Sequence, residues 1–453
     1  MKWIIVDVKA HCAQEICKLR AFSEICAKVF VFNENFALFS LPTIVQMNLS
    51  FPLDTSTILV VLALAAWLVF FTIVGINGLA LKDLRQTSLA KPQSALPRLS
   101  VIVAACNEEK TLEKALQSLL ATDYPDVEFL IVNDRSTDGT GAIIDRIAFH
   151  DKRVKPLHIA VLPDGWLGKV HALHTASNQA SGEFLLFTDA DIHFAPDALT
   201  LALSLAEAQH LDHFVVVPET RKPASSNAWQ QWLVSVTIAG FASLFLFSLR
   251  LRSLRNPQST AFVGVGAFNL VRTSAFRKTL GFEWLKMEVI DDLGLGMMMK
   301  RSGARCDAAN GVGVLHLEWY ASFGEIAQGF EKNFFAGFGR YRWRVMLWRV
   351  SQIAAMVLLP YLAALWALWA HGNMALVVLV LCVHFVLPLL ATLVMRKRLP
   401  LEPIFFATMP LSFLLTIVLM LRSAWQTTRK GGIAWRGTFY PLQTLRKEQR
   451  VQM

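Results

Sequence analysis

The sequence is poor in charge for its length, and its cysteines form no recognisable metal or redox pattern. Charged residues make up 17% of the 453 residues, whereas hydrophobic residues make up 54%. None of the six cysteines belongs to a CxxC pair or to a Cys/His spacing that holds zinc. We therefore expect no disulfide framework, and a reducing compartment for the globular part of the chain.

The common motifs for binding nucleotides and nucleic acids are missing as well. Neither GxGxxG nor GxxxxGK[ST] occurs, so the sequence supports no dinucleotide or P-loop site. The formal net charge is +10, but no Lys/Arg block is interleaved with aromatic residues, and we expect no nucleic-acid partner. Basic clusters instead adjoin apolar runs, as in "RLRSLR" and "MRKR", which is typical of a cytoplasmic membrane face. Solvated charges that only raise the pI are the alternative.

Long apolar runs are abundant. Four of them approach the roughly 20 residues that a bilayer requires, at residues 57–77, 353–370, 374–395 and 404–421. A fifth run, 233–249, lies within sequence of soluble character, so we expect a helix on the membrane surface there. Residues 1–46 are interpreted as an uncertain N-terminal extension, or as a reading frame begun too early, because they show no signal-peptide cleavage site.

The basic flanks "KDLR" and "RYRWR" place the soluble region, residues 82–350, in the cytoplasm. The sequence thus predicts a multi-pass protein of a bacterial inner (cytoplasmic) membrane. One conflict stays open, because four spans from an outside N-terminus would leave the basic tail, 422–453, outside. Either the last apolar segment does not cross fully, or the charge rule fails in this protein.

Strand and helix patterns alternate within residues 99–200, which predicts an α/β fold with a parallel, mostly buried sheet. "LSVIVAA", "VEFLIVND" and "EFLLFTDAD" are expected strands. Ligands of such sheets bind at the carboxyl ends of the strands, where Asn107, Asp134, Asp189 and Asp191 fall. Asp134 introduces the turn "RSTDGT", which is either an ordinary helix cap or a contact to a nucleotide base or ribose.

Asp189 and Asp191, in "FTDAD", keep both carboxylates on the same side of an extended chain. Such a pair suits Mg²⁺ or Mn²⁺ on a nucleotide diphosphate, and the polar edge of a turn is the alternative. A second acidic cluster contains Glu288, Asp291 and Asp292. It is either a helix cap favoured by the helix dipole or a site for a general base with a raised pKa.

The ordered set "VIVAACNEEKTLEKALQSLLATDYP", "VNDRSTDGT", "GWLGKVHAL", "FTDAD" and "VIDDLGLG" resembles the membrane-bound inverting glycosyltransferases of family 2, which have a GT-A fold. The resemblance covers about residues 99 to 345. "PDGWLGKVHAL" and "GGIAWRGTFYPL" are most similar to the subgroup that glycosylates membrane lipids, namely the hopanoid-associated and carotenoid-acid enzymes and, more distantly, ceramide glucosyltransferase.

Residue by residue, the resemblance implies a donor pocket formed by Asn107, Glu108, Asp134 and Lys169. It implies a metal on Asp189 and Asp191, with Asp191 the more direct ligand, and a general base at Asp292 with Asp291 beside it. "FVGVGAFNLVR" (262–272) is similar to the family's acceptor loop.

The family's Q/R-x-x-R-W element departs from its pattern, since "GRYRW" (339–343) has Gly339 at the first position. The resemblance leaves Arg342 as the expected diphosphate contact and puts processive synthesis in doubt. Trp343 and Trp348 are alternatively anchors at the membrane interface.

The resulting expectation is a hexosyltransferase that moves one sugar from a nucleotide-sugar, expected to be a UDP-sugar, to a membrane lipid acceptor with inversion. A processive polysaccharide synthase and a non-catalytic membrane scaffold with the same fold are the alternatives.

Overall fold

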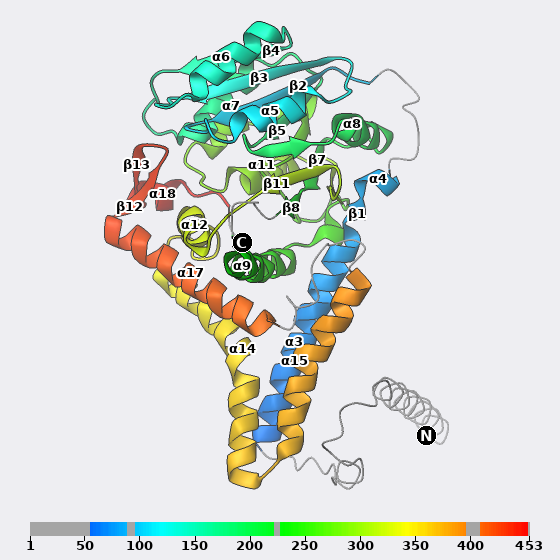
Figure 1. Cartoon of the computed structure of the whole chain (residues 1–453), viewed down its shortest axis with the longest axis vertical. Coiled ribbons are helices and arrows are strands. Elements are labelled where there is room, and N and C mark those ends of the chain that lie inside the picture. The colour runs from blue at the N-terminus through cyan, green and yellow to red at the C-terminus, as the bar shows by residue number, and fades with distance from the viewer. Residues whose placement is uncertain (1–54, 88–95, 222–226, 396–407, 452–453) are drawn as a thin grey trace. The chain divides into compact units, whose positions relative to one another are not determined.

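The computed structural model describes residues 55–87, 96–221, 227–395 and 408–451. The expected extension 1–46 and the first residues of the expected span 404–421 lie outside this described part. Its main features are a mixed β-sheet, a set of long apolar helices and a C-terminal hairpin (Figure 1).

The central sheet has eight strands in the order β1-β10-β7-β9-β5-β2-β3-β4. Neighbouring strands are parallel except at β9, which runs antiparallel to both β5 and β7. Every residue of β2 and β5 is buried, as expected for strands that helices cover on both faces. The strands are β1 (Lys82–Asp83), β2 (Leu99–Ala105), β3 (Val127–Asp134), β4 (Val154–Ile159), β5 (Phe184–Thr188), β7 (His213–Val217), β9 (Asn269–Arg272) and β10 (Cys306–Asn310).

The parallel α/β arrangement predicted for residues 99–200 is confirmed. Strand β4 has no counterpart among the expected strands, because it lies at the sheet edge and contains Pro156 and exposed polar residues rather than an apolar run. The antiparallel β9 belongs to the expected acceptor loop, 262–272, and its insertion between β5 and β7 makes the sheet mixed.

Helices cover the sheet by burying apolar positions at helical spacing. In α5, for example, Leu112, Ala115, Leu116 and Leu119 are buried.

A small sheet in the order β6-β11-β8 adjoins the carboxyl end of β5. The elements are α4 (Leu84–Thr87), α5 (Leu112–Leu120), α6 (Thr140–His150), α7 (Gly168–Gln179), α8 (Ala198–Ala208), α10 (Thr273–Phe276), α11 (Asp291–Arg301), α12 (Phe323–Gly329), α13 (Glu331–Gly337), η1 (Leu251–Ser253), η2 (Gly281–Leu285), β6 (Ile192–Phe194), β8 (Glu219–Arg221) and β11 (Leu315–Glu318).

Three long helices, α3 (Thr55–Ala80), α14 (Trp343–His371) and α15 (Met374–Met395), pack against one another (Figure 1). Helix α9 (Ala228–Ser248) packs on α17 (Met409–Lys430). By length and composition, four described helical stretches could cross a membrane: Thr55–Ala80, Ala228–Ser253, Trp343–His371 and Met409–Lys430. The helices expected at 57–77, 233–249 and 374–395 are therefore present.

The boundaries of the two other expected spans differ from the structure. Helix α14 begins at Trp343 rather than at 353, because its first turns carry arginines that lower the hydropathy without breaking the helix. Helix α17 continues to Lys430. Its second half buries small residues, among them Ser423, against α13, and the Ser423 hydroxyl accepts a hydrogen bond from the Phe335 N–H at 2.9 Å.

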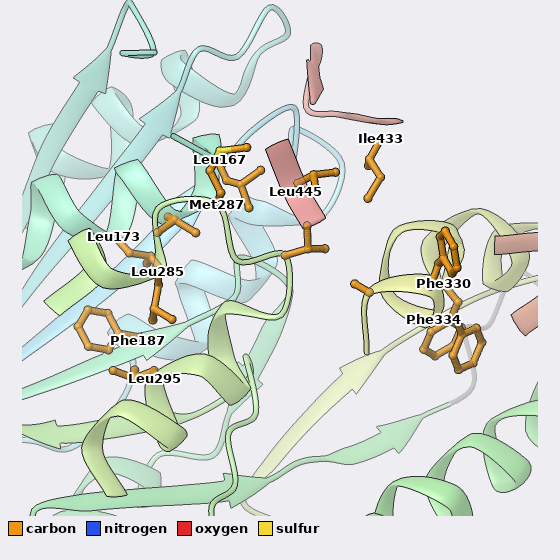
Figure 2. Packing of buried hydrophobic residues seen from close by; sticks show 14 of the residues in the cluster. Leu167, Leu173, Phe187, Leu285, Met287, Leu295, Phe330, Phe334, Ile433 and Leu445 are labelled. Carbon is orange, nitrogen blue, oxygen red and sulfur yellow. The ribbon is translucent and has the colours of Figure 1, made fainter. Parts of the chain in front are cut away.

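The described part of the stretch expected to be a basic tail, residues 422–451 of 422–453, belongs to the folded structure. After α17, strands β12 (Gly432–Trp435) and β13 (Thr438–Pro441) form an antiparallel hairpin, and α18 (Leu442–Glu448) follows. Leu445 of α18 is fully buried within the main apolar cluster. Figure 2 shows Leu445 between Met287 on one side and Phe330 on the other.

Candidate active site

The carboxyl ends of β2 and β5 open into a cavity of about 640 Å³. Glu108 follows β2, and Asp189 and Asp191 follow β5, and all three line this cavity. Lys169, in the first turn of α7, and Asp292, in the first turn of α11, line it as well. Asp291, next to Asp292, also lines the cavity. Six of the residues expected in the site are thus brought together at the predicted edge of the sheet.

Two glycines of the 262–272 loop let the backbone approach the acidic residues closely. A Cβ at Gly266 would lie 2.4 Å from Asp189 Oδ2, and a Cβ at Gly264 would lie 1.8 Å from the Asp292 carbonyl oxygen. The Gly266 N–H donates to Asp292 Oδ2 at 3.0 Å, and its carbonyl accepts from the Asp189 N–H at 3.0 Å. The loop therefore holds Asp189 and Asp292 in fixed positions.

Lys169 neutralises part of the acidic cluster. Its Nζ lies 2.7 Å from Asp189 Oδ1 and 3.5 Å from Asp291 Oδ2. Burial works against the charged form of Asp189, but the Lys169 ammonium outweighs it and lowers the pKa of this carboxyl. Burial likewise disfavours the Lys169 charge, while Asp189, Asp291 and Asp292 outweigh burial and raise the lysine pKa. Both groups are charged at neutral pH.

Asp191 differs from Asp189 in having no ion pair within the described residues. Burial, followed by the negative charges of Asp189 and Glu108, raises the pKa of Asp191 to about 7. Burial is also the main cause of the raised pKa of Glu108. Burial and the neighbouring carboxylates therefore disfavour the charged form of Asp191.

The carboxylate side chains at this site suit a hard divalent cation. Among the residues that the structure describes, no group of three or more His, Cys, Asp or Glu residues is arranged to hold a metal. Asp189 and Asp191 offer two carboxylates, however, and Mg²⁺ commonly takes one or two carboxylates together with phosphate oxygens and water. Such an ion would favour the charged form of Asp191, and Asp189 and Asp191 would hold it.

Asp292 has the environment of a general base. Its Oδ1 accepts the Leu293 N–H at 2.8 Å, and its backbone carbonyl accepts from Asn269 Nδ2 at 3.1 Å. Burial, followed by the charge of Asp291, raises the pKa of Asp292 to about 7. The Lys169 charge and the hydrogen bond from the Leu293 N–H act in the opposite direction and favour the carboxylate. Near pH 7 this group exists in both protonation states, as a base that takes up and releases a proton must.

Three expected site residues lie elsewhere. Asp134 is fully buried beneath Arg135, whose Nε donates to Asp134 Oδ1 at 2.8 Å. Asn107 is exposed and its side chain accepts the Thr137 N–H at 2.8 Å, so it fastens one loop to the next. Arg342 is exposed at the start of α14 and does not line the cavity. Glu288, in the second acidic cluster, accepts the N–H groups of Arg450 and Val451.

Two cations that sequence reasoning missed line the polar end of the cavity, Lys332 of α13 and Arg436 of the C-terminal hairpin. Arg436 Nη1 lies 3.7 Å from Asp134 Oδ2. The only signal for Arg436 in the sequence is the segment "GGIAWRGTFYPL", which points to a related subgroup but not to a position in the fold. Lys332 carries no local motif.

Another part of the cavity lining is apolar and aromatic, and we call it the aromatic end. Helix α9 contributes Ile238, Phe241 and Phe245, and further aromatic side chains complete the wall, namely Trp319, Tyr320, Phe330, Phe334 and Phe338. The Phe241 ring lies 4.6 Å from the Phe330 ring and 5.8 Å from the Phe334 ring, between centroids. One cavity therefore joins a carboxylate-rich end to a wall suited to hydrocarbon.

Comparison with known proteins identifies the central part of the chain. Residues 100–280 match the family model described as Glycosyl transferase family 2. A beta-monoglucosyldiacylglycerol synthase from Nostoc sp. is 29% identical over 231 residues, which cover 49% of this chain and 46% of that protein. A GalNAc(5)-diNAcBac-PP-undecaprenol beta-1,3-glucosyltransferase from Campylobacter jejuni is 32% identical over 111 residues, covering 24% of this chain and 35% of that protein.

The chain thus spans less than half the length of these two curated relatives. Among solved structures, a mannosyltransferase from Pyrobaculum calidifontis in complex with GDP-Man and Mn²⁺ has a TM-score of 0.48 and 18% identity, covering 80% of this chain and 99% of that one. At this distance the likeness carries no inference about ligands.

Proposed function

Because the chain carries a family 2 glycosyltransferase domain with a GT-A-like fold, we propose that it transfers a single sugar from a UDP-sugar to a membrane lipid. The observation that carries this proposal is the continuity of the cavity, from the carboxylates at the strand ends to the aromatic wall of α9 and α13. A nucleotide diphosphate sugar suits the first end, and the hydrocarbon part of a lipid suits the second.

The reaction is an in-line displacement with inversion. The acceptor oxygen forms a bond to the anomeric carbon while the bond from that carbon to the diphosphate oxygen breaks. Asp292 takes the acceptor proton on its carboxylate, and the Gly266 N–H holds that carboxylate in place. Lys169 keeps Asp189 ionised and oriented. A divalent cation held by Asp189 and Asp191 would offset charge on the diphosphate leaving group.

The membrane arrangement follows from which elements are tied to the sheet. The segment containing α9 leaves from β8 and returns to β9, so both of its ends belong to the same domain. Tyr440 of the C-terminal hairpin accepts a hydrogen bond from the Gly168 N–H at 3.1 Å. The hairpin and the sheet therefore lie on one side of the membrane, with α3, α14 and α15 crossing it and α9 and α17 lying along its surface.

This arrangement resolves the charge conflict of the sequence by placing the basic C-terminal segment in the cytoplasm with the catalytic domain. The apolar helices support it, because α3 and α14 expose large side chains such as Leu62 and Leu362, each at 61%. Side chains of this kind are stable in contact with lipid. The location is the inner membrane of a bacterium.

The test is transfer of label from a panel of radiolabelled nucleotide sugars to lipid in membranes containing the full chain. We expect one labelled lipid bearing one sugar, which a processive synthase would not produce. Asp292→Asn should lower the rate by about a hundredfold or more, because it removes the base. Equal labelling with Asp292→Asn would contradict the base assignment, and a labelled polymer would contradict single transfer.

A further inference from the structure

Two cations at the polar end of the cavity take no part in the reaction described above. They are Lys332 of α13 and Arg436, which occupies the turn between β12 and β13. Arg436 lies far along the chain from the acidic strand ends, beyond the family match of residues 100–280. The C-terminal hairpin nevertheless brings it to the ends of β2 and β3.

The guanidinium of Arg436 contacts the ends of β2 and β3 and lies over the Trp435 ring, with its Cζ 5.8 Å from the ring centre. Its Nη2 donates to the Ala104 carbonyl at 3.4 Å, and Nη1 lies 3.7 Å from Asp134 Oδ2. Nη1 is buried without a hydrogen-bond partner among the described residues. Arg436 also has a φ of 49°, in the left-handed region that few non-glycine residues adopt. The fold thus places a buried donor at the cavity in a conformation that the sequence does not favour.

Lys332 lies beside Arg436 and has no carboxylate within ion-pair distance in the part of the chain that the structure describes. Its Nζ lies 3.6 Å from the centre of the Trp435 ring, so its partner is an aromatic face rather than an acid. Burial, together with the charges of Lys169 and Arg436, lowers the pKa of Lys332 to about 7. An anion bound between Lys332 and Arg436 would relieve this repulsion.

The hairpin is fastened to the wall of the donor pocket. Arg135 Nη1 donates to Thr438 Oγ1 at 2.8 Å, and the Tyr440 hydroxyl accepts from the Gly168 N–H, one residue before Lys169. Beyond the hairpin, the Arg450 N–H donates to Glu288 Oε2 at 2.7 Å, and Glu288 lies three residues before Asp291. These contacts hold the hairpin against the same elements that carry the acidic residues.

We propose that Arg436 and Lys332 bind the diphosphate of the donor, so that the C-terminal hairpin forms one wall of the donor site. The inference rests on the proposed function, because that function supplies the nucleotide diphosphate. Asp134 is then a positioning residue that orients Arg436, and Trp435 does the same for Lys332. Arg436 and Lys332 thus make the diphosphate contact that the resemblance assigned to Arg342, which lies outside the cavity.

The alternative is that these cations only balance the charges of Glu108, Asp189 and Asp191. Charge balance predicts that their loss changes stability and the pKa of the acids, with no preference between phosphorylated and unphosphorylated ligands. Diphosphate binding predicts a loss confined to phosphorylated ligands. Comparing UDP with uridine separates the two explanations.

The experiment is titration calorimetry of the full chain in detergent with UDP and with uridine, in the presence of Mn²⁺. For Arg436→Ala and Lys332→Gln we expect UDP affinity to fall by about tenfold each, the effect of one charge-assisted contact, with uridine affinity unchanged. Arg436→Lys should retain part of the UDP affinity. Arg429→Ala, an exposed arginine in the last turn of α17, is the matched control and should bind both ligands as the unmodified protein does.

The outcomes distinguish this inference from the proposed function. If the unmodified chain binds UDP and both variants bind it equally well, the inference is wrong while the proposed function stands. The inference is also wrong if folded Lys332→Gln and Arg436→Lys variants lose affinity for UDP and for uridine to the same extent. If the unmodified chain does not bind UDP, both proposals fail. Thermal unfolding of each variant shows which of them are folded. If Arg436→Ala is unfolded, the UDP and uridine affinities of Arg436→Lys and Lys332→Gln decide the question.

Discussion

The acidic end and the aromatic end of the cavity are built in different ways. The loops after the buried strands β2 and β5 and the first turn of α11 form the acidic end, where Gly266 holds the Asp292 carboxylate and the Asp189 backbone through hydrogen bonds. Side chains of α9, of α13 and of the residues next to it, and of the segment after β11 form the aromatic end, and ring contacts such as Phe241 with Phe330 hold them. Proton transfer and diphosphate binding need fixed polar atoms, whereas a hydrocarbon chain needs only a matching apolar surface.

This difference predicts that damage to the acidic end stops turnover, while damage to the aromatic end weakens only acceptor binding. The largest effect is expected for Asp191→Asn, which removes the carboxylate that has no ion pair. Donor affinity in the presence of Mn²⁺ should fall by at least about a hundredfold, since even outer-shell changes cost about 10- to 100-fold in metal affinity. Calorimetry with UDP, with and without EDTA, measures this loss.

The matched control for Asp191→Asn is Asp123→Asn, an exposed aspartate away from the cavity, which should bind UDP normally. Equal UDP affinity for Asp191→Asn and the unmodified chain, with no response to EDTA, would remove the metal from the proposal.

An intermediate effect is expected from pH. Asp292 acts as a base in its carboxylate form, so the rate should decline as the pH falls through its pKa of about 7. Below the pKa, the rate should decrease by about tenfold per pH unit. The measurement is initial rate against pH at saturating donor and acceptor.

Asp291→Asn sharpens this pH prediction, because the Asp291 charge is the second cause of the raised pKa of Asp292, after burial. The acid limb of the profile should move to lower pH in this variant. A limb that stays in place would indicate that another group controls the profile.

The smallest effect is expected at the aromatic end. Phe241→Ala should raise the KM for the lipid acceptor by roughly three- to tenfold, because it removes part of the apolar surface that the acceptor would bury. Donor affinity should not change. Phe247→Ala, on the same helix but stacked on Phe70 instead of lining the cavity, is the matched control. A larger change in donor affinity than in acceptor KM would contradict the division of the cavity into two ends.

Much of the acidic end could be predicted from the sequence because its parts are local. Asp189 and Asp191 directly follow a buried apolar run, and strand-end residues of a parallel sheet meet at one edge. Asp292 likewise begins a helix that its own sequence defines. The prediction was less informative for Asn107 and Asp134, because whether a strand-end side chain faces the cavity depends on its neighbours. Arg135 covers Asp134, and Thr137 engages Asn107.

The sequence by itself determined the α/β alternation, the apolar helices and the acidic strand ends, because each depends on residues within one short segment. Only the tertiary structure decided which cations face those acids and which side chains form the aromatic wall. Arg436 reaches Asp134 across about 300 residues of chain, and Phe241 of α9 meets Phe330, which lies between α12 and α13. Charge and shape at a site depend on such distant contacts, for which no local pattern exists.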